Sequence, residues 1–371
     1  MVRRVAAEYL LKILGDSKTL YASYRVRARS LVNRLSNDIL VGRAFLVEEH
    51  RYGKLLDKHL GLSIIGSKGD IESDLMVTRN NSNNVIKIDT NFEEIEGPRI
   101  VVDVRYYDLH KSDEKMSLIE QMRLITVLLR DYLTEGHYIV TSANEHFMKD
   151  FLKGNYDFRG KIHEKRFNEI LNKEETIVLD PFGDIEFDAS LFKEYKYFVI
   201  GGIVDRGCRF QGFTSRMAED FERARISLKG DIKGVPDRIN RIAEILIYLY
   251  CGVASTIEEA IKLAQAPIVA RKRLPIELKR RAIRFEMSGR RWYAIALSDY
   301  EELHDIMNFR DSDIERVLDR DLIVITDELY ERIISSKSFE SFGRVVYIPE
   351  GISEDFFRSN IVKVIGKAKE V

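Results

Sequence analysis

Cysteine is nearly absent from this sequence, since Cys208 and Cys251 are the only two in 371 residues. Two cysteines cannot build a zinc cluster by themselves and do not indicate a disulfide framework, so a reducing cytosol is the expected compartment. His110, His137 and His146 are scattered without the spacing of metal ligands, and we expect no metal.

Long apolar segments are absent as well. No stretch approaches 18 apolar residues, and charged residues interrupt residues 1–14, which therefore do not form a signal peptide. The sequence predicts a soluble, cytoplasmic protein with no membrane partner.

Two common nucleotide-binding motifs are also missing. The chain contains neither G-x-G-x-x-G nor G-x-x-x-x-G-K-[ST], which disfavours a Rossmann-type dinucleotide site and a P-loop. This absence counts against one rival interpretation, an unrelated α/β enzyme such as a nicotinamide-dependent oxidoreductase.

Two glycine-bearing loops are the main positive feature. In residues 197–206 an apolar strand runs into Gly201-Gly202 and then Asp205, and residues 228–237 form a second such turn before a strongly helical segment. Glycine lets a backbone turn tightly or approach a ligand closely. Because parallel α/β sheets bind ligands outside the carboxyl ends of their strands, the loops predict a small-molecule pocket. A β-turn with Asp205 as a helix cap is the alternative.

The length of the chain and its breaker residues predict three regions. A polar segment at residues 78–84 and the Gly-Pro pair at 97–98 place a boundary near residue 98, and Ala266-Pro267 marks a later exit. We expect an N-terminal RNA-binding or accessory domain (1–97), a central domain (98–253) and a C-terminal α/β accessory domain with a basic segment (254–371).

Hydrophobic patterning predicts alternating strands and helices in the central and C-terminal regions. The expected central strands are 100–104, 138–141, 176–179, 197–200 and 226–228, and the expected helices are 116–133, 237–250 and 255–265. In the C-terminal region, strands at 293–298, 322–326 and 345–349 predict a small parallel α/β unit.

A formal net charge of −1 hides a local basic excess. Between Arg271 and Arg291 nine Lys or Arg residues accompany only two acids, and Trp292 and Tyr293 follow. Basic residues beside aromatic ones predict contacts with nucleic-acid phosphates and bases, with a solvated helix face as the alternative. A milder basic run at 25–34 is expected on a helix. The RNA-binding candidates are Arg206, Arg271, Lys272, Arg273, Arg280 and Arg281.

Three ordered blocks resemble one known family. Residues 177–184 (Ile-Val-Leu-Asp-Pro-Phe-Gly-Asp), 199–206 and 228–246 are similar to the archaeal branch of the tRNA purine-9 N1-methyltransferase family of the SPOUT superfamily. The resemblance covers roughly residues 98 to 253. It implies a trefoil-knotted parallel α/β sheet with flanking domains, S-adenosylmethionine as methyl donor, tRNA as partner and a monomeric enzyme.

The resemblance also implies roles for individual residues. Asp205 matches the proposed general base of the family. Gln121 matches a glutamine near the reaction centre, and the alternative is an ordinary exposed glutamine on a helix. The implied cofactor contacts are Leu179, Gly201, Gly202, Ile203, Leu228, Gly230, Gly234, Val235 and Pro236.

The identity of the purine stays open at this point. Guanine carries a proton on N1 that a base must remove, whereas adenine offers a lone pair and yields a cationic product that a carboxylate stabilises. Asp205 serves either chemistry. By analogy we favour adenine, with guanine or dual specificity as one alternative and a non-enzymatic RNA-binding protein as another.

Overall fold

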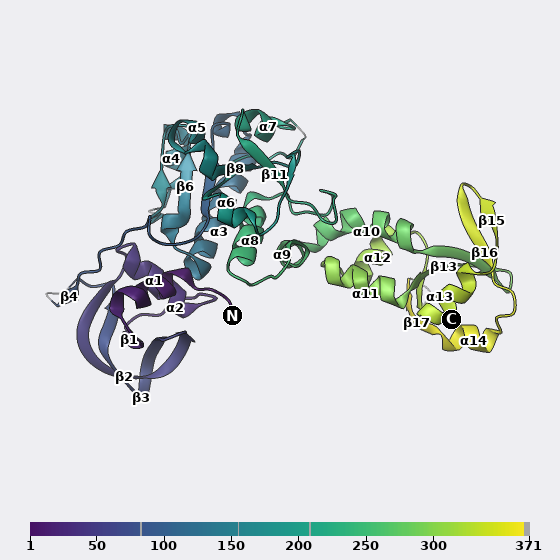
Figure 1. The fold of residues 1–371 in the computed structure, drawn as a ribbon, viewed down its shortest axis with the longest axis horizontal. Helices are drawn as coiled ribbons and strands as arrows, with labels where there is room; N and C mark the ends of the chain where they lie inside the picture. The colour runs from purple at the N-terminus through teal and green to yellow at the C-terminus, as the bar shows by residue number, and fades with distance from the viewer. Residues whose placement is uncertain (82–83, 155, 208, 367–371) are drawn as a thin grey trace. The chain divides into compact units, whose positions relative to one another are not determined.

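The computed structural model describes residues 1–81, 84–154, 156–207 and 209–366. They form two compact units (Figure 1). The first unit comprises Met1–Ile226 with Asp237–Ala260, and the second comprises Ser227–Pro236 with the chain from Ile261 onward. No helix in the described ranges combines the length and apolarity needed to cross a bilayer. Cys208 and part of the predicted 78–84 linker lie outside the described residues.

The N-terminal part of the first unit carries a sheet of its own, in the order β1-β3-β2-β4. Its elements are α1 (Val5–Leu14), β1 (Lys18–Ala22), α2 (Leu31–Leu40), β2 (Phe45–His59), β3 (Leu62–Thr78) and β4 (Val85–Ile86). The helix expected over the basic run 25–34 begins only at Leu31. Ser30 sets this start, because its side chain accepts a hydrogen bond from the Asn33 N–H as an N-cap.

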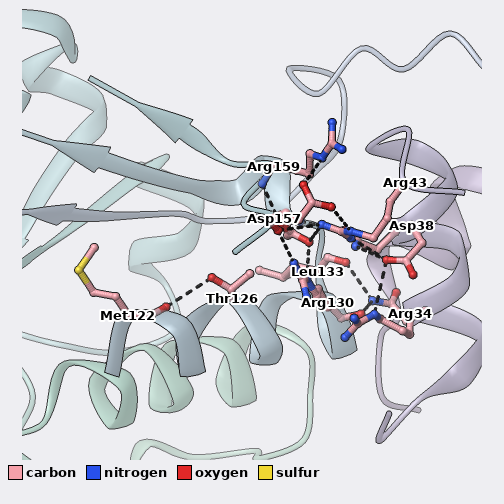
Figure 2. A network of polar contacts seen from close by, with 12 residues as sticks. Arg34, Asp38, Arg43, Met122, Thr126, Arg130, Leu133, Asp157 and Arg159 are labelled. Atoms are coloured by element: carbon pink, nitrogen blue, oxygen red, sulfur yellow. Dashed lines mark hydrogen bonds and ion pairs between the residues drawn. The ribbon is translucent and has the colours of Figure 1, made fainter. Parts of the chain in front are cut away.

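A buried polar network joins α2 to the central part of the same unit (Figure 2). The Arg43 guanidinium lies 2.7 Å from Asp38, 2.6 Å from Glu135 and 2.9 Å from Asp157. Arg130 pairs with the same Glu135. Buried charges are tolerated only when they are paired, so the network specifies how the N-terminal sheet is attached. The boundary predicted near residue 98 thus falls inside one compact unit, and an accessory role for residues 1–97 stays a prediction.

The central sheet has seven strands in the order β7-β6-β5-β10-β8-β11-β9, and all its paired neighbours are parallel. The strands are β5 (Arg99–Asp103), β6 (Tyr138–Thr141), β7 (Lys161–Ile162), β8 (Thr176–Leu179), β9 (Ile185–Glu186), β10 (Tyr197–Gly201) and β11 (Glu222–Arg225). The helices are α3 (Ser112–Tyr132), α4 (Glu145–Phe151), α5 (Phe167–Ile170), α6 (Leu191–Glu194), α7 (Phe213–Ala218), α8 (Ile239–Tyr250) and α9 (Ile257–Ala264), with 3₁₀ turns η1 (Tyr107–Leu109), η2 (Glu135–His137) and η3 (Lys173–Glu175). The predicted parallel α/β fold of this region is confirmed.

Amphipathic patterning explains the two long helices of the central region. Leu118, Met122, Ile125 and Leu129 of α3 recur at helical spacing and are buried, and α3 packs against α8. The strand predicted at 226–228 is wrong. The strand is β11, whose arginines pair with Asp184 and Glu186, so its polar sequence concealed it.

The second unit contains a six-stranded sheet in the order β15-β16-β12-β13-β14-β17. Its elements are α10 (Pro267–Arg281), β12 (Ile283–Met287), β13 (Arg290–Ala296), α11 (Leu297–Ile306), α12 (Asp311–Val317), β14 (Leu322–Ile325), α13 (Asp327–Ile334), β15 (Lys337–Ser341), β16 (Arg344–Ile348), α14 (Glu354–Ser359) and β17 (Ile361–Ile365).

This second sheet corrects one expectation. It is mixed instead of parallel, because the two-residue turn Ser288-Gly289, with φ of 52° and 73°, joins β12 and β13 as an antiparallel hairpin. Pro267, where the exit from the central domain is predicted, lies in a helix. It occupies the first turn of α10, where proline is tolerated because the first N–H has no helical partner.

Candidate active site at the carboxyl edge of the central sheet

The carboxyl ends of β5, β10 and β8 lie side by side. Gly201 pairs in register with Asp103 of β5, and Ile200 pairs with Leu179 of β8. Three segments that are far apart in sequence thus reach one edge of the sheet, which is where open parallel sheets collect ligands. The structure brings together Leu179 and the first glycine loop, and their contact with a cofactor stays a prediction.

Gly202 is required by close packing of the backbone. Its N–H donates to the Asp103 carbonyl at 2.8 Å, and a Cβ at this position would lie 2.7 Å from the same oxygen. Gly201 is less constrained, since its Cβ would meet the Thr214 hydroxyl at 3.0 Å. The sequence allowed two explanations for the glycine pair, a tight turn and a close approach of the backbone. Close approach to the Asp103 carbonyl explains Gly202.

Replacing Gly202 with alanine is expected to destabilise the first unit by about 1–3 kcal/mol, the typical cost of overpacking a tight site. Urea unfolding followed by far-ultraviolet circular dichroism measures this loss. Gly207→Ala is the matched control, because the nearest heavy atom to a Cβ there is 4.0 Å away. Equal stability of the two variants would contradict the close-packing explanation.

Asp103 is a buried structural carboxylate at the end of β5. It accepts hydrogen bonds from Arg105, Thr141 and Ser142 at distances between 2.9 and 3.2 Å. These bonds tie the ends of β5 and β6 together and place the backbone carbonyl that receives Gly202.

Asp205 closes the loop that follows β10. One carboxylate oxygen accepts from the N–H groups of Gly207 and Arg209 at 3.0 Å each, and the other accepts from Phe210 at 2.8 Å. Asp205 is exposed, and the desolvation that remains acts to raise its pKa, but the three amide donors outweigh this effect and hold the pKa below its usual value. In this state Asp205 accepts hydrogen bonds from its own loop and caps no helix, because the next helix, α7, has Gly212 as its N-cap, and the carboxylate is ionised at neutral pH.

Side chains from the start of α3 fasten the same loop. Arg206 pairs with Asp113 at 2.6 Å, and Arg209 pairs with Glu114. His110 accepts the Val204 N–H at Nε2 (3.0 Å), while its Nδ1 lies 3.2 Å from the Tyr107 carbonyl. No local sequence signal indicates this contact of the buried His110.

Gln121 is buried, with 5% of its surface exposed, and the expected alternative of an exposed helical glutamine is wrong. Its Oε1 accepts from the Ile239 N–H at 3.0 Å, and its Nε2 donates to Ser117 at 3.1 Å. It therefore satisfies an N–H in the first turn of α8. These bonds do not test a role in holding the target base, so that role stays a prediction.

The second glycine loop belongs to the second unit. Leu228 and Asp231 bond to each other through their backbones, and Gly230 takes φ of 79° with no heavy atom within 4 Å of where a Cβ would lie. Gly234, at φ of 94°, packs on Arg273, and its carbonyl accepts from Gln265 at 2.5 Å. Val235 and Pro236 follow directly. A backbone that is open at Gly230 fits a ligand recognised through main-chain groups.

The basic helix α10 requires a correction. Arg273 is 1% exposed and contacts Asp231 at 2.7 Å and Glu277 at 2.6 Å, so it is unavailable to RNA. Arg281 is also largely covered, because it pairs with Glu277, Asp299 and Glu302. The expectation that few acids neutralise this segment fails, since three of these carboxylates come from outside it.

Other members of the basic cluster are more accessible. Arg271 is partly exposed and lies 3.4 Å from Asp313. Arg280 is 62% exposed, with Glu277 at 3.8 Å. Arg271, Lys272 and Arg280 stay RNA-binding predictions, as does the exposed Arg206.

One group of potential metal ligands occurs among the described residues. His50, Glu72 and Asp74 are exposed on β2 and β3, with His50 2.8 Å from Asp74 and 3.4 Å from Glu72. Exposed acidic groups of this kind are common without an ion, and no metal is assigned.

Comparison with known proteins identifies related sequences and folds. The family model for tRNA (guanine(9)-N(1))-methyltransferase TRM10/TRM10A matches residues 67–233. A tRNA (guanine(9)-/adenine(9)-N1)-methyltransferase of Thermococcus kodakarensis is 32% identical over 240 residues, which cover 62% of this chain and 64% of that protein, somewhat under two thirds of the relative's length. A tRNA (adenine(9)-N1)-methyltransferase of Sulfolobus acidocaldarius is 28% identical over 255 residues, covering 68% of this chain and 80% of that protein.

A solved structure shows the same fold. The crystal structure of Sulfolobus acidocaldarius Trm10 in complex with S-adenosylhomocysteine superposes with a TM-score of 0.60 at 24% identity, covering 85% of this chain and 98% of that one. The family model includes Gln121, Leu179, the first glycine loop and Asp205, and it ends within the second loop. The resemblance seen in the sequence is confirmed.

Proposed function

We propose, from its similarity to the TRM10 family model and to two curated relatives, that this chain is a TRM10-type enzyme that transfers a methyl group from S-adenosylmethionine to N1 of the purine at position 9 of tRNA. The observation that carries the proposal is the placement, inside the matched region, of Leu179, the glycine pair and Asp205 at the carboxyl edge of the parallel sheet.

Leu179, Gly201, Gly202 and Ile203 are the cofactor contacts proposed for the first unit. S-adenosylmethionine, when bound, supplies an electrophilic methyl group on a sulfonium. Leu179 is an apolar, largely buried side chain at the end of β8, whereas the glycine loop offers main-chain groups. Leu228, Gly230, Gly234, Val235 and Pro236 are proposed contacts of the second loop.

Asp205 is better suited to adenine than to guanine. Its carboxylate is ionised and already accepts three amide hydrogen bonds, which lower its basicity. A weakened base removes the guanine N1 proton poorly, whereas a fixed negative charge stabilises the cation that forms on N1-methyladenine. We therefore propose adenine as the preferred purine, with dual specificity as the alternative that the Thermococcus relative represents.

The remaining parts of the proposal concern topology and RNA binding. A SPOUT-type trefoil knot in the central sheet, a monomeric state and a cytoplasmic location are proposed from the family. N1 lies on the Watson–Crick edge, so the base must leave the tRNA core to react, and flanking RNA-binding surfaces serve that requirement. Arg206, Arg271, Lys272 and Arg280 are the proposed phosphate contacts.

The deciding experiment incubates the full chain with S-adenosylmethionine and two tRNA transcripts that differ only in A or G at position 9. Nucleoside digestion and mass spectrometry then identify the product, which we expect to be N1-methyladenosine at position 9. N1-methylguanosine would contradict only the purine preference. Methylation solely at another position would refute the reaction, and tight tRNA binding without any methylation would instead support a non-enzymatic RNA-binding protein.

A further inference from the structure

The second unit contains a cavity of about 510 Å³ beside the β15–β16 hairpin. Four arginines line it against two aspartates; the arginines are Arg284, Arg290, Arg291 and Arg320. The lining residues come from β12, β13, residues 319–321 and the β15–β16 hairpin, whose two strands are labelled in Figure 1. A volume of this size is in the range of small-ligand sites.

The positive charge of the cavity is only partly compensated. Arg320 pairs with Asp319 at 2.8 Å and Arg291 with Glu286 at 3.3 Å, but among the described residues no carboxylate pairs with Arg284 or Arg290. The Nε of Arg284 is buried and has no hydrogen-bond partner in that part of the chain. Burial, together with the neighbouring Arg344 and Arg320, lowers the pKa of Arg284. An unsatisfied guanidinium next to further cations favours an anion.

An exposed aromatic ring stands at the rim of the same cavity. Phe342 is 98% exposed and has φ of 50°, followed by Gly343 at 68°, in the turn between β15 and β16. Such turns favour asparagine or aspartate before glycine, and a phenylalanine in left-handed backbone carries a cost in strain. Neither burial nor turn preference explains this residue, so an external partner for the ring is the simplest physical reason.

The aromatic residues predicted from sequence for base stacking are less available. Tyr293 is buried and donates its hydroxyl to the Leu278 carbonyl at 3.0 Å. Trp292 packs on Phe285 and Phe357, and Arg290 lies 4.2 Å from the centroid of its ring. Trp292 nevertheless lines the cavity and is the only tryptophan of the chain, so its fluorescence reports on this place alone.

We propose that this cavity binds one nucleotide of an unpaired RNA segment, with its phosphate against Arg284 and Arg290 and its base stacked on Phe342. Guanidinium groups recognise phosphate oxygens in pairs, and aromatic stacking is the usual means of holding an unpaired base. An acidic protein would satisfy the arginines but leave Phe342 without a planar partner. The identification of the RNA as tRNA rests on the function proposed above.

The test titrates the full chain with a short single-stranded oligouridylate and follows Trp292 fluorescence. We expect saturable quenching that weakens as salt rises. Phe342→Ala should weaken the apparent affinity about tenfold, the effect of losing one stacked base, and Phe342→Tyr should restore it. Arg284→Gln should lower the log–log salt slope by about 0.7, the value for one phosphate contact on a single strand.

Arg316→Gln is the matched control, because Arg316 is an exposed arginine of α12 in the same unit and outside the cavity. Unchanged affinity in both Phe342→Ala and Arg284→Gln would overturn the proposal, and so would equal quenching by polyglutamate. Methylation of the transcripts is assayed separately. Quenching without methylation would refute the proposed enzymatic function and leave the cavity assignment standing. Methylation without quenching would refute the cavity assignment and leave the enzymatic function standing.

Discussion

Replacing Asp205 with asparagine is expected to slow methylation of a guanine-9 transcript by about a hundredfold, the lower end of the usual contribution of a general base, because the amide hydrogen bonds weaken the basicity of Asp205. The loss on an adenine-9 transcript should be smaller, because adenine N1 has no proton to remove. Asparagine keeps one oxygen that accepts from Gly207 and Arg209, but its amide group faces the Phe210 N–H as a second donor. Single-turnover rates with saturating cofactor measure the effect.

The pKa of Asp205 determines how its pH profile should look. Because the pKa is lowered, the carboxylate stays ionised above its usual titration range, and its stabilising bonds are lost only as the pH falls through the lowered value. Between pH 6 and 9 the ionisation of Asp205 does not change, so Asp205 causes no pH dependence of the methylation rate in this range. If methylation of the guanine-9 transcript becomes faster with pH over this range, the increase should persist in Asp205→Asn, because it reflects deprotonation of the guanine N1 and not of Asp205.

Two comparisons keep this prediction falsifiable. Asp113→Asn removes the ion-pair partner of Arg206, which lies in the same loop as Asp205, and leaves the Asp205 carboxylate unchanged. This variant therefore measures how much a less firmly held loop slows methylation. Calorimetric titration with S-adenosylhomocysteine shows whether the loop of Asp205→Asn still supports binding. Wild-type rates of Asp205→Asn on both transcripts would exclude a catalytic role for Asp205.

Sequence patterns located the centre of the fold well, because its signals are local. Strands β6 and β8 have the predicted bounds, and α8 begins within two residues of its prediction, since apolar runs and turn residues bound each of them. The carboxyl edge follows from parallel pairing, which brings Gly201 beside Asp103 whatever their separation in sequence. The position of this edge could therefore be predicted from the sequence alone.

Ion pairs between residues that are far apart in the sequence could not be predicted. Arg273 looked like a phosphate contact because its partner Asp231 lies 42 positions earlier and Asp299, the partner of Arg281, lies 18 positions later. Periodicity describes one segment at a time and contains no information on such pairs. The same limitation applies to Gln121, whose partner Ile239 is 118 positions away.

Replacing Arg273 with methionine is expected to destabilise the second unit by about 1–3 kcal/mol, the cost of losing its hydrogen bonds, because the carboxylate left without its partner, Asp231, is partly exposed to water. Arg273 contacts Asp231 at 2.7 Å, Glu277 at 2.6 Å and the Lys233 carbonyl at 3.3 Å, so one side chain holds the second glycine loop onto α10. Glu277 retains Arg281 in the variant, whereas Asp231 loses its ion pair. Urea unfolding followed by Trp292 fluorescence measures the stability of this unit.

The same variant separates a loop-positioning role from general stability. Arg280→Met changes an exposed arginine of the same helix and should alter stability by no more than about 0.5 kcal/mol. Arg273→Lys keeps the charge but loses the fork that reaches both carboxylates, so it should recover only part of the loss. If Leu228 and Gly230 bind the cofactor as proposed, affinity for S-adenosylhomocysteine should fall in Arg273→Met at temperatures where the unit is still folded. Full stability together with unchanged affinity would mean that Arg273 does not fix the loop, and the argument that removes it from the RNA-binding surface would then fail as well.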